Sequence, residues 1–395
     1  MKAGFIGLGS MGAPIARRLA RCGFIVTGCD VVPAMLEAFD EPGTARCADP
    51  LETARASEVL GICVRTDEQL EALVDAGKLY EALGSGGLII LHSTVSPQLA
   101  IRLADLAREH GVGFVDVGVS GGGPAAIEGQ LSLFVGGTDE DVSLAKPWLD
   151  AIGKQMAHLG PVGRGQEAKL INNLISIANY GMSAAIIDLG VDMGFDRQQL
   201  IDALMAGSAQ SFALGVGPRM VQPRTGMGAP STFSGLHDLL KKDVDHAAEL
   251  PTGEITSRDS LVAAARFMLT RINRAAAEAE GGAAPPQPVE TVKAYVAAVR
   301  ARDLDGFVSL FADTATYTVP NGKTMNGPAE IREFQAMVFG AGQPSPTPLE
   351  WFVAPDGVAV EIEAKLPDGS VRLTTNHYRF DASGRISSLK VFART

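Results

Sequence analysis

The stretch VGRGQEAKLINNLIS (162–176) places a lysine where it could transfer a proton. Lys169 has apolar neighbours, and Asn173 follows four residues later, on the same face if the segment is helical. A neutral lysine amine can take a hydroxyl proton when burial or a nearby cation lowers its pKa. The alternative is a solvated lysine on a helix surface, which is the commoner situation for this residue type.

The second candidate is the turn Gly7-Leu8-Gly9-Ser10-Met11-Gly12, a GxGxxG that follows the apolar run KAGFIG (2–7) and opens an amphipathic helix. In this context the first glycine permits the tight turn, the second admits a pyrophosphate and the third lets helix and strand pack closely. The free N–H groups of the helix N-terminus then face the anion. The turn therefore predicts dinucleotide binding, with a glycine-favouring strand–helix turn as the alternative.

Asp30 ends the next apolar run, FIVTGCD (24–30). A carboxylate there can accept hydrogen bonds from an adenosine ribose and would repel a 2′-phosphate. Val31 and Val32 follow, so no arginine lies next to Asp30 in the sequence to bind that phosphate. The pattern favours NAD over NADP. The alternative is an aspartate that only caps a turn.

The elements that must position these residues change along the chain. Strand-like runs at 59–64, 87–92, 113–117 and 131–136 alternate with helical patterns, which predicts a parallel sheet. Helical periodicity without strands then continues to about residue 280, and EGGAAPPQPVE (280–290) has the composition of a linker. Helices from 289 and short β-type runs follow. We predict an α/β Rossmann domain (1–160), an all-α domain (161–279), a linker (280–288) and an independently folding α+β domain with an antiparallel sheet (289–395).

The composition of the chain limits the classes of binding partner that are to be expected. The net charge of -11 argues against nucleic acid or an anionic membrane, and 46% apolar residues are ordinary for a globular chain. The four cysteines form no CxxC pair and have no histidine at ligand spacing, so we expect reduced thiols, no metal and a cytoplasmic location. The apolar segment 170–191 contains Asn172, Asn173, Asn179 and Asp188, which favours a buried helix over a membrane span.

Four stretches, taken together and in order, resemble the β-hydroxyacid dehydrogenases, the family of 3-hydroxyisobutyrate dehydrogenase and 6-phosphogluconate dehydrogenase. They are GFIGLGSMGAPIARRL (4–19), DVGVSGGGPAAIEGQLSLFVGG (116–137), GRGQEAKLINN (163–173) and LLKKDVDHA (239–247). The resemblance covers roughly residues 1–250. It implies that Gly7, Gly9, Ser10, Met11 and Gly12 bind the cofactor.

The resemblance also assigns roles to residues that bind and convert the substrate. Ser120, Gly121 and Gly122 match the loop that holds the substrate carboxylate through a hydroxyl and backbone amides, which is chemistry that a nest of exposed amides supports. Lys169 matches the acid/base for the reacting oxygen, and Asn173 can orient either the substrate hydroxyl or Lys169. A solvated lysine is the commoner situation, but the resemblance makes a functional Lys169 the favoured interpretation.

Lys242 and Asp243 match a late lysine–aspartate pair that closes over substrate and cofactor, and Lys242 could be the cation that lowers the pKa of Lys169. The alternative is a charged turn of a surface helix. Thr94 is expected to contact the cofactor. The chain departs from the family before it, because the family usually has an aspartate two residues before the Ser-Thr and the run here is Leu91-His92-Ser93-Thr94. We interpret His92 as a strand-end residue, with contact to cofactor or substrate as the alternative. The segment after Asp243 is also shorter than the family's helical tail.

Residues 289–395 resemble the cone-shaped fold of ketosteroid isomerase, polyketide cyclases and nuclear transport factor 2, on the stretches 295–334 and 377–393. The polar candidates for its interior are Asp313, Tyr317, Glu361 and His377, for each of which a structural or exposed position is the favoured interpretation. These motifs indicate a fold more than an activity.

The function expected from these observations is an NAD-dependent dehydrogenase of a small 3-hydroxy acid or its semialdehyde. The resemblance implies a homodimer or homotetramer. Two alternatives stay open: a ketone or imine reductase on the same scaffold, which the retained Lys169 disfavours, and a non-catalytic NAD-linked sensor with a ligand-binding cone domain.

Overall fold

The computed structural model describes residues 1–220, 230–252, 255–279, 288–341, 345–354, 357–365, 371–381 and 383–393. The chain divides into two compact units, Met1–Ile175 with Lys242–Gly253, and Ser176–Lys241 with Glu254–Thr395. The division runs through a helix, so the segment with Lys169 and Asn173 groups with the N-terminal residues of the chain. The predicted linker 280–288 lies outside the described residues except for Pro288, which begins a helix.

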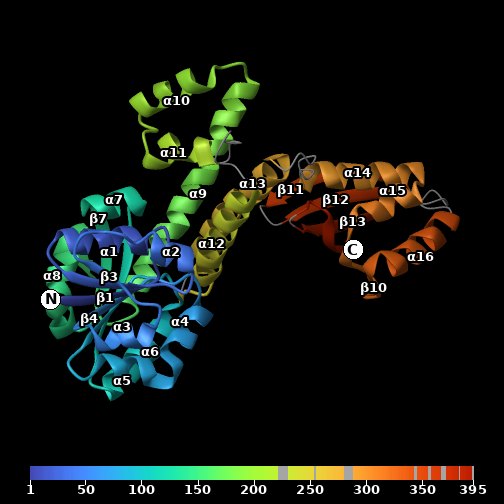
Figure 1. Ribbon diagram of the computed structural model, residues 1–395. Coiled ribbons are helices and arrows are strands. Elements are labelled where there is room, and N and C mark those ends of the chain that lie inside the picture. The colour runs from blue at the N-terminus through green and yellow to red at the C-terminus, as the bar shows by residue number, and fades with distance from the viewer. Residues whose placement is uncertain are drawn as a thin grey trace. The chain divides into compact units, whose positions relative to one another are not determined.

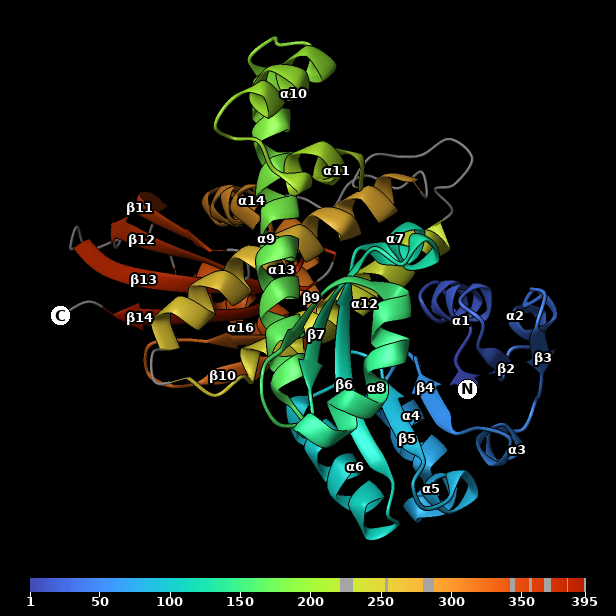
Figure 2. The ribbon, with the colours of Figure 1, turned by 90° about the vertical axis from the view of Figure 1, so that its left-hand side faces the viewer.

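The first unit is built on an eight-stranded sheet with the order β3-β2-β1-β4-β5-β6-β7-β8, whose strands are coloured blue to green in Figure 2. Its strands are β1 (Lys2–Ile6), β2 (Ile25–Cys29), β3 (Thr44–Arg46), β4 (Val59–Ile62), β5 (Leu88–Leu91), β6 (Gly113–Ser120), β7 (Leu131–Gly136) and β8 (Gly153–His158). The fold class is the predicted Rossmann type. The prediction of a wholly parallel sheet is wrong at one place, because β6 and β7 pair antiparallel. Only a seven-residue helix, α7, and a short turn connect them, too little chain for a parallel crossover.

Helices cover both faces of this sheet (Figure 1). They are α1 (Gly12–Arg21), α2 (Pro33–Glu37), α3 (Pro50–Arg55), α4 (Asp67–Val74), α5 (Lys78–Leu83), α6 (Pro97–Glu109), α7 (Gly122–Glu128) and α8 (Asp139–Ile152), with a 3₁₀ turn at Asp75–Gly77. Thr66, Ser96 and Thr138 begin α4, α6 and α8 as side-chain N-caps.

Successive strand residues bury their side chains on opposite faces of the sheet. Phe5 belongs to a core that includes residues of α1 and α8, whereas Ile6 belongs to a second core that includes residues of α4, α5 and α6. Strands buried on both faces must be apolar throughout, which explains the unbroken run in β5, where all four residues are buried. The two cores fix the carboxyl ends of β1, β4 and β5 at one edge, where ligands bind in such sheets.

The N-terminal turn of α9 (Arg164–Asp192) lies directly against β6 and β7. A Cβ at Gly118 would lie 2.5 Å from the Cβ of Lys169, and one at Gly136 would lie 2.8 Å from the Gly165 amide nitrogen. A Cβ at Gly165 itself would lie 2.6 Å from the Asp116 carbonyl oxygen. Three glycines therefore permit an approach that any side chain would block, and this approach brings Lys169 onto the sheet.

The second unit begins with the rest of α9 and is helical through residue 279. Its helices are α10 (Arg197–Ala206), α11 (Phe212–Met220), α12 (Pro230–Ala248), of which residues from Lys242 belong to the first unit, and α13 (Ile255–Ala279). Asp188 on α9 accepts hydrogen bonds from Arg197, at 2.7 Å, and from Arg271. Gly181 packs against Met268, so α9 and α13 approach closely.

Helix α9 is long and apolar enough to cross a membrane by length and composition, with a mean hydropathy of 1.5. Only 39% of that apolar window is buried. Ile171, Ile175, Met182 and Ile186 are exposed, so burial of this helix within one chain is less complete than the sequence predicted.

The C-terminal part of the second unit is a six-stranded sheet with the order β10-β9-β14-β13-β12-β11. Its elements are α14 (Pro288–Ala301), α15 (Leu304–Ser309), β9 (Phe311–Thr318), β10 (Thr324–Asn326), α16 (Gly327–Gly340), β11 (Ser345–Ala354), β12 (Gly357–Lys365), β13 (Val371–Phe380) and β14 (Ile386–Ala393). Tyr295, Phe307, Phe311 and Tyr378 form its aromatic core. The expected antiparallel sheet is corrected to a mixed one, because β14 pairs parallel to β9.

We predict that Gly118→Ala destabilises the first unit and displaces Lys169. The added methyl would meet the Lys169 Cβ and the Gly165 carbonyl oxygen, and overpacking of this kind costs ~1–3 kcal/mol. Gly340→Ala is the matched control, because no atom lies within 4 Å of a Cβ there. Scanning calorimetry should show a lowered transition for Gly118→Ala alone; equal transitions in both variants would contradict the packing described for α9.

Candidate active site

The glycine-rich turn has the geometry that a dinucleotide requires. Gly7 has a φ of +92°, and a Cβ there would lie 2.3 Å from the Cys63 carbonyl oxygen. A Cβ at Gly12 would lie 1.8 Å from the Gly7 carbonyl oxygen, so α1 begins tightly against β1. Gly9 has no atom within 4 Å of a Cβ position, which leaves open space beside the helix N-terminus. The turn, with Ser10 and Met11 at its tip, therefore fits a pyrophosphate.

Asp30 lies at the end of β2, beside this turn. Its Oδ2 accepts a hydrogen bond from the Leu8 amide at 2.7 Å, and its Oδ1 accepts one from the Val32 amide at 2.8 Å. The carboxylate thus does cap its own turn, as the alternative interpretation held. Each carboxylate oxygen can accept a further bond, so the residue still fits a ribose diol.

The loop after β5 has two different roles. His92 is buried, its Nε2 accepts a hydrogen bond from the Trp148 indole at 3.1 Å, and its ring lies nearly parallel to those of Phe5 and Trp148, with each centroid 6.0 Å away. Burial lowers its pKa to about 4, so it is a neutral core residue at the strand end. Thr94, two residues on, presents its carbonyl oxygen to the ammonium group of Lys242.

The substrate loop predicted at 120–122 joins two elements, because Ser120 is the last residue of β6 and Gly122 is the first residue of α7. Gly121 and Gly122 have φ values of +134° and +76°, so the backbone there takes conformations that favour glycine. A Cβ at Gly123 would lie 3.1 Å from the Ser10 carbonyl oxygen. The exposed amides of this loop therefore lie beside the dinucleotide turn, within reach of an anion bound next to a cofactor.

Lys169 lies on the first turns of α9, partly buried, with its stem over Gly118. Burial lowers its pKa from the usual 10.5 to about 8; the carboxylate of Asp243 works against this shift, and the ammonium of Lys242 supports it. Among the described residues no hydrogen bond to the Lys169 ammonium is formed. A lysine with this pKa exists as both amine and ammonium near neutral pH, as proton transfer requires.

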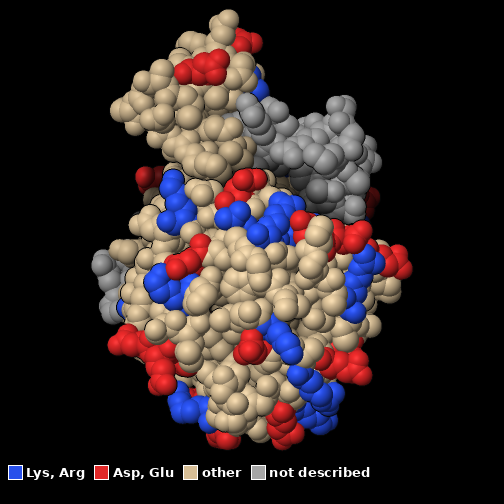
Figure 3. Space-filling view, turned by 60° about the vertical axis from the view of Figure 1, so that its left-hand side comes forward, with Lys and Arg blue, Asp and Glu red and all other residues tan. Residues whose placement is uncertain are grey.

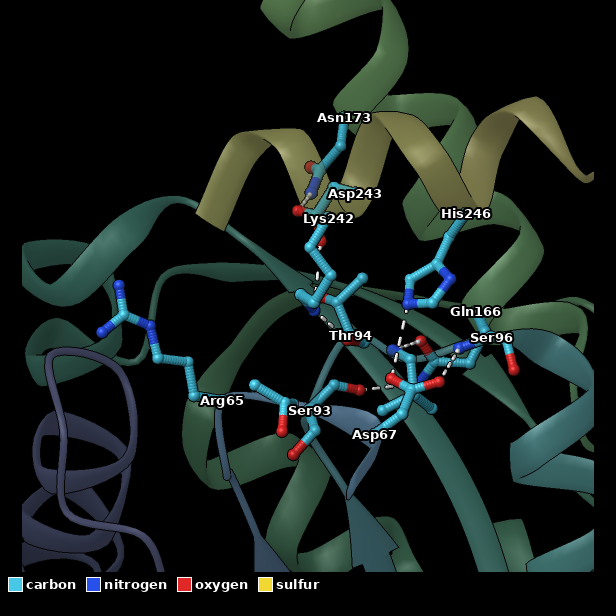
Figure 4. Close-up of polar contacts among 12 residues, drawn as sticks. Arg65, Asp67, Ser93, Thr94, Ser96, Gln166, Asn173, Lys242, Asp243 and His246 are labelled. Atoms are coloured by element: carbon cyan, nitrogen blue, oxygen red, sulfur yellow. Dashed lines mark hydrogen bonds and ion pairs between the residues drawn. The ribbon is translucent and has the colours of Figure 1, made fainter. Parts of the chain in front are cut away.

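Asn173 on α9 meets Lys242 and Asp243 on α12, and Figure 4 shows these three side chains close together above Thr94. Asn173 donates from Nδ2 to Asp243 Oδ2 at 2.6 Å, which ties α9 to α12. Lys242 Nζ lies 3.2 Å from Asp243 Oδ1. The structure thus brings Lys169, Asn173, Lys242 and Asp243 together at the edge where Thr94 lies.

A second network supports this site, and sequence analysis missed it. The buried Asp116 carboxylate accepts hydrogen bonds from the amides of Gly163, at 2.9 Å, and Gln166, at 2.7 Å. The Gln166 side chain donates to the Ser93 carbonyl oxygen and accepts from the Val95 amide. Burial raises the Asp116 pKa to about 6 although both amides lower it. A charged residue inside the apolar run GFVDVGVS was the available signal.

The C-terminal candidates belong to the second unit. Asp313 is exposed and pairs with Arg385 at 3.1 Å, and His377 is exposed and packs on Phe392. Tyr317 is buried in the aromatic core, and Glu361 is partly buried on β12.

Acidic and basic side chains lie beside one another on the described part of the face in Figure 3, so the net negative charge is spread rather than gathered there.

We predict that the enzyme prefers NAD to NADP and that Asp30→Ser relaxes the preference. The carboxylate would repel a 2′-phosphate, and serine removes that charge. Binding of each cofactor can be measured by fluorescence titration. Asp40→Ser is the control, because this carboxylate is exposed and its ion pair is with Arg46, away from the glycine turn. Equal affinity of the unsubstituted protein for both cofactors would contradict the role given to Asp30.

The match to known families divides the chain in three. The NAD binding domain of 6-phosphogluconate dehydrogenase matches residues 2–160, the NAD-binding domain of NADP-dependent 3-hydroxyisobutyrate dehydrogenase matches 163–285, and a SnoaL-like domain matches 292–389. The SnoaL-like match agrees with the cone fold expected for the C-terminal module.

Individual relatives support the first two matches. An NAD-dependent L-serine dehydrogenase from Pseudomonas aeruginosa is 31% identical over 261 residues, which are 64% of this chain and 86% of that protein. A 2-(hydroxymethyl)glutarate dehydrogenase from Eubacterium barkeri is 32% identical, over 54% of this chain and 71% of the relative. The structure of Mycobacterium tuberculosis 3-hydroxyisobutyrate dehydrogenase with L-serine superposes with a TM-score of 0.55 and 25% identity, over 72% of this chain and 95% of that one. The chain therefore belongs to the β-hydroxyacid dehydrogenase family of NAD(P)-dependent oxidoreductases.

Proposed function

We propose that the protein oxidises a small 3-hydroxy acid, of the size of 3-hydroxyisobutyrate or serine, or reduces the corresponding semialdehyde. The observation that carries this proposal is Lys169, whose pKa burial lowers to about 8 beside Lys242 and Asp243. An amine poised near neutral pH can accept a hydroxyl proton in one direction and return it in the other.

The nicotinamide cofactor, when bound, accepts or supplies the hydride. Gly7, Gly9 and Gly12 would admit its pyrophosphate, and Asp30 would hold its adenosine ribose. In the oxidation Lys169 takes the proton from the substrate hydroxyl at Nζ. Lys242 stays bonded to the Thr94 carbonyl oxygen, where its charge disfavours the protonated form of Lys169.

The substrate class follows from the loop after β6. Ser120 offers a hydroxyl, and the amides at Gly121 and Gly122 are exposed, so together they suit a carboxylate. This loop and Lys169 both adjoin β6, because the loop starts at the end of that strand and the Lys169 stem on α9 packs over Gly118, two residues before Ser120. A molecule that carries a carboxylate and a hydroxyl a few bonds apart would engage both. The named relatives act on compounds of this kind.

We infer that residues 289–395 supply none of the hydride-transfer groups. The residues given roles here, Lys169, Asn173, Lys242 and Asp243, all belong to the first unit. The C-terminal module has its own aromatic core and its own sheet. Pairing of subunits or binding of a related small molecule are the roles that we propose for it.

We predict that Lys169→Ala lowers kcat about 100- to 10,000-fold while NAD binding is retained, because general acid–base groups contribute factors of this size. NAD turnover should be measured with 3-hydroxyisobutyrate, L-serine, L-threonate and 2-(hydroxymethyl)glutarate. Lys146→Ala is the matched control, since this lysine is exposed and forms an ion pair with Asp150 one turn along the same helix.

Three results would contradict the proposal. Turnover in Lys169→Ala close to that of Lys146→Ala would remove Lys169 from the mechanism. NAD binding without turnover of any hydroxy acid or semialdehyde would favour the non-catalytic sensor, and turnover of cyclic imines alone would favour the imine reductase.

A further inference from the structure

The side chains of His246 and Asp67 are in contact close to Lys242, and the function proposed above gives neither residue a role. His246 lies on α12 one helical turn after Lys242, and its Nε2 is 3.3 Å from Asp67 Oδ1. Their side chains are only 18% and 21% exposed. Figure 4 shows the imidazole directed from α12 toward Asp67 at the start of α4.

Asp67 joins three segments at the carboxyl edge of the sheet. It is the first residue of α4, which follows β4, and its Oδ2 accepts a hydrogen bond from the amide of Ser96 at 3.2 Å. Ser96 in turn begins α6, which follows β5. Asp67 therefore links the loops after β4 and β5 to α12 through His246.

Helix α12 is held to these loops by two basic side chains in the first unit. Lys242 donates to the Thr94 carbonyl oxygen, and His246 contacts Asp67 one turn later. Between them Asp243 receives the hydrogen bond from Asn173. Two contacts on one face, a turn apart, fix both the position and the rotation of this helical segment, which one contact could not do.

We propose that Asp67 and His246 are a positioning pair, which keeps Lys242 and Asp243 in place beside Lys169 and so sets the protonation of the acid/base. This inference rests on the proposed function, since it gives regulation of the same site. Neither residue touches the reacting atoms; each acts through α12.

The electrostatics of the pair agree with this role. Burial alone would raise the Asp67 pKa, but the hydrogen bond and charge of His246, the Ser96 amide and the charge of Lys242 together hold that pKa below its usual value. Asp67 is therefore ionised at neutral pH. Glu68 on α4 also feels the charge of His246 but is exposed, and Asp245 lies beside His246 on α12.

Loosening the pair should raise the pKa of Lys169. Burial is the main cause that lowers this pKa, and movement of α12 would admit water to the amine. The pKa of Lys169 therefore reports whether the contact between Asp67 and His246 is intact. A change in the stability of the protein alone would not change this pKa.

The test is competitive labelling of the full-length protein with acetic anhydride across a pH series, with the extent of reaction at Lys169 read by peptide mass spectrometry. No substrate is needed. In the unsubstituted protein we expect half-maximal reactivity of Lys169 near pH 8. In Asp67→Asn and in His246→Leu the pKa should rise by about one unit, which is ~10-fold less free amine below the pKa.

Two further variants sharpen the test. His246→Gln keeps a donor where Nε2 lies and should return the Lys169 pKa toward that of the unsubstituted protein. His158→Asn removes another histidine–aspartate pair of the first unit, His158 with Asp139 at 3.6 Å, and should leave Lys169 unchanged. Circular dichroism of each variant confirms that it is folded before labelling.

The outcomes separate the two proposals. A Lys169 pKa near 10 in the unsubstituted protein would overturn the role of Lys169 in the proposed function. A pKa near 8 that is the same in Asp67→Asn and His246→Leu would overturn the positioning pair alone. If His246→Gln behaves like His246→Leu, the ring and not the pair is responsible, and the inference is also overturned.

Discussion

The candidate site depends on the close approach of the first turn of α9 to strands β6 and β7. Glycines at 118, 136 and 165 remove the side chains that would hold the helix away, and the buried Asp116 carboxylate accepts hydrogen bonds from the amides at its start. A negative charge at a helix N-terminus is favourable because it meets the positive end of the helix dipole. These contacts fix the position of Lys169, one turn further along the helix, and its partial burial follows from that position.

Burial lowers the pKa of Lys169 far enough for proton transfer, and the neighbouring charges adjust the size of this shift. Taking an ammonium out of water favours the neutral amine, which is why the pKa of Lys169 falls to about 8. Lys242 adds to the effect and Asp243 opposes it, so α12 sets the balance. The helix that supplies these charges is fixed by contacts to the loops after β4 and β5, the same loops that end at the cofactor edge of the sheet. Fold, helix position and acid–base chemistry are therefore linked through a few polar contacts.

Much of this arrangement could be predicted from residue types and spacing. The glycine turn, Asp30, the alternation of strands and helices and the start of a separate C-terminal fold are local patterns. The spacing of Lys169 and Asn173 made them candidates, and the family resemblance supplied their roles. The antiparallel β6–β7 pair and the parallel β14–β9 pair were missed because strand direction is set by tertiary connections and leaves no local pattern. Gln166, Asp67 and His246 were missed for a related reason: their partners lie far away in sequence, and a single polar residue on a helix is usually solvated.

The central claim is that Lys169 exchanges the proton of the reacting hydroxyl, and the pH dependence of kcat/KM tests it most directly. This parameter reports the ionisation of the free enzyme. In the oxidation direction, with NAD and the fastest hydroxy acid of the panel, kcat/KM should rise with pH and level off above a pKa of about 8, because only the neutral amine accepts the proton. The same limb should be absent from the residual activity of Lys169→Ala. A profile that is flat from about pH 6.5 to about 9.5, or a limb that persists without Lys169, would contradict the account.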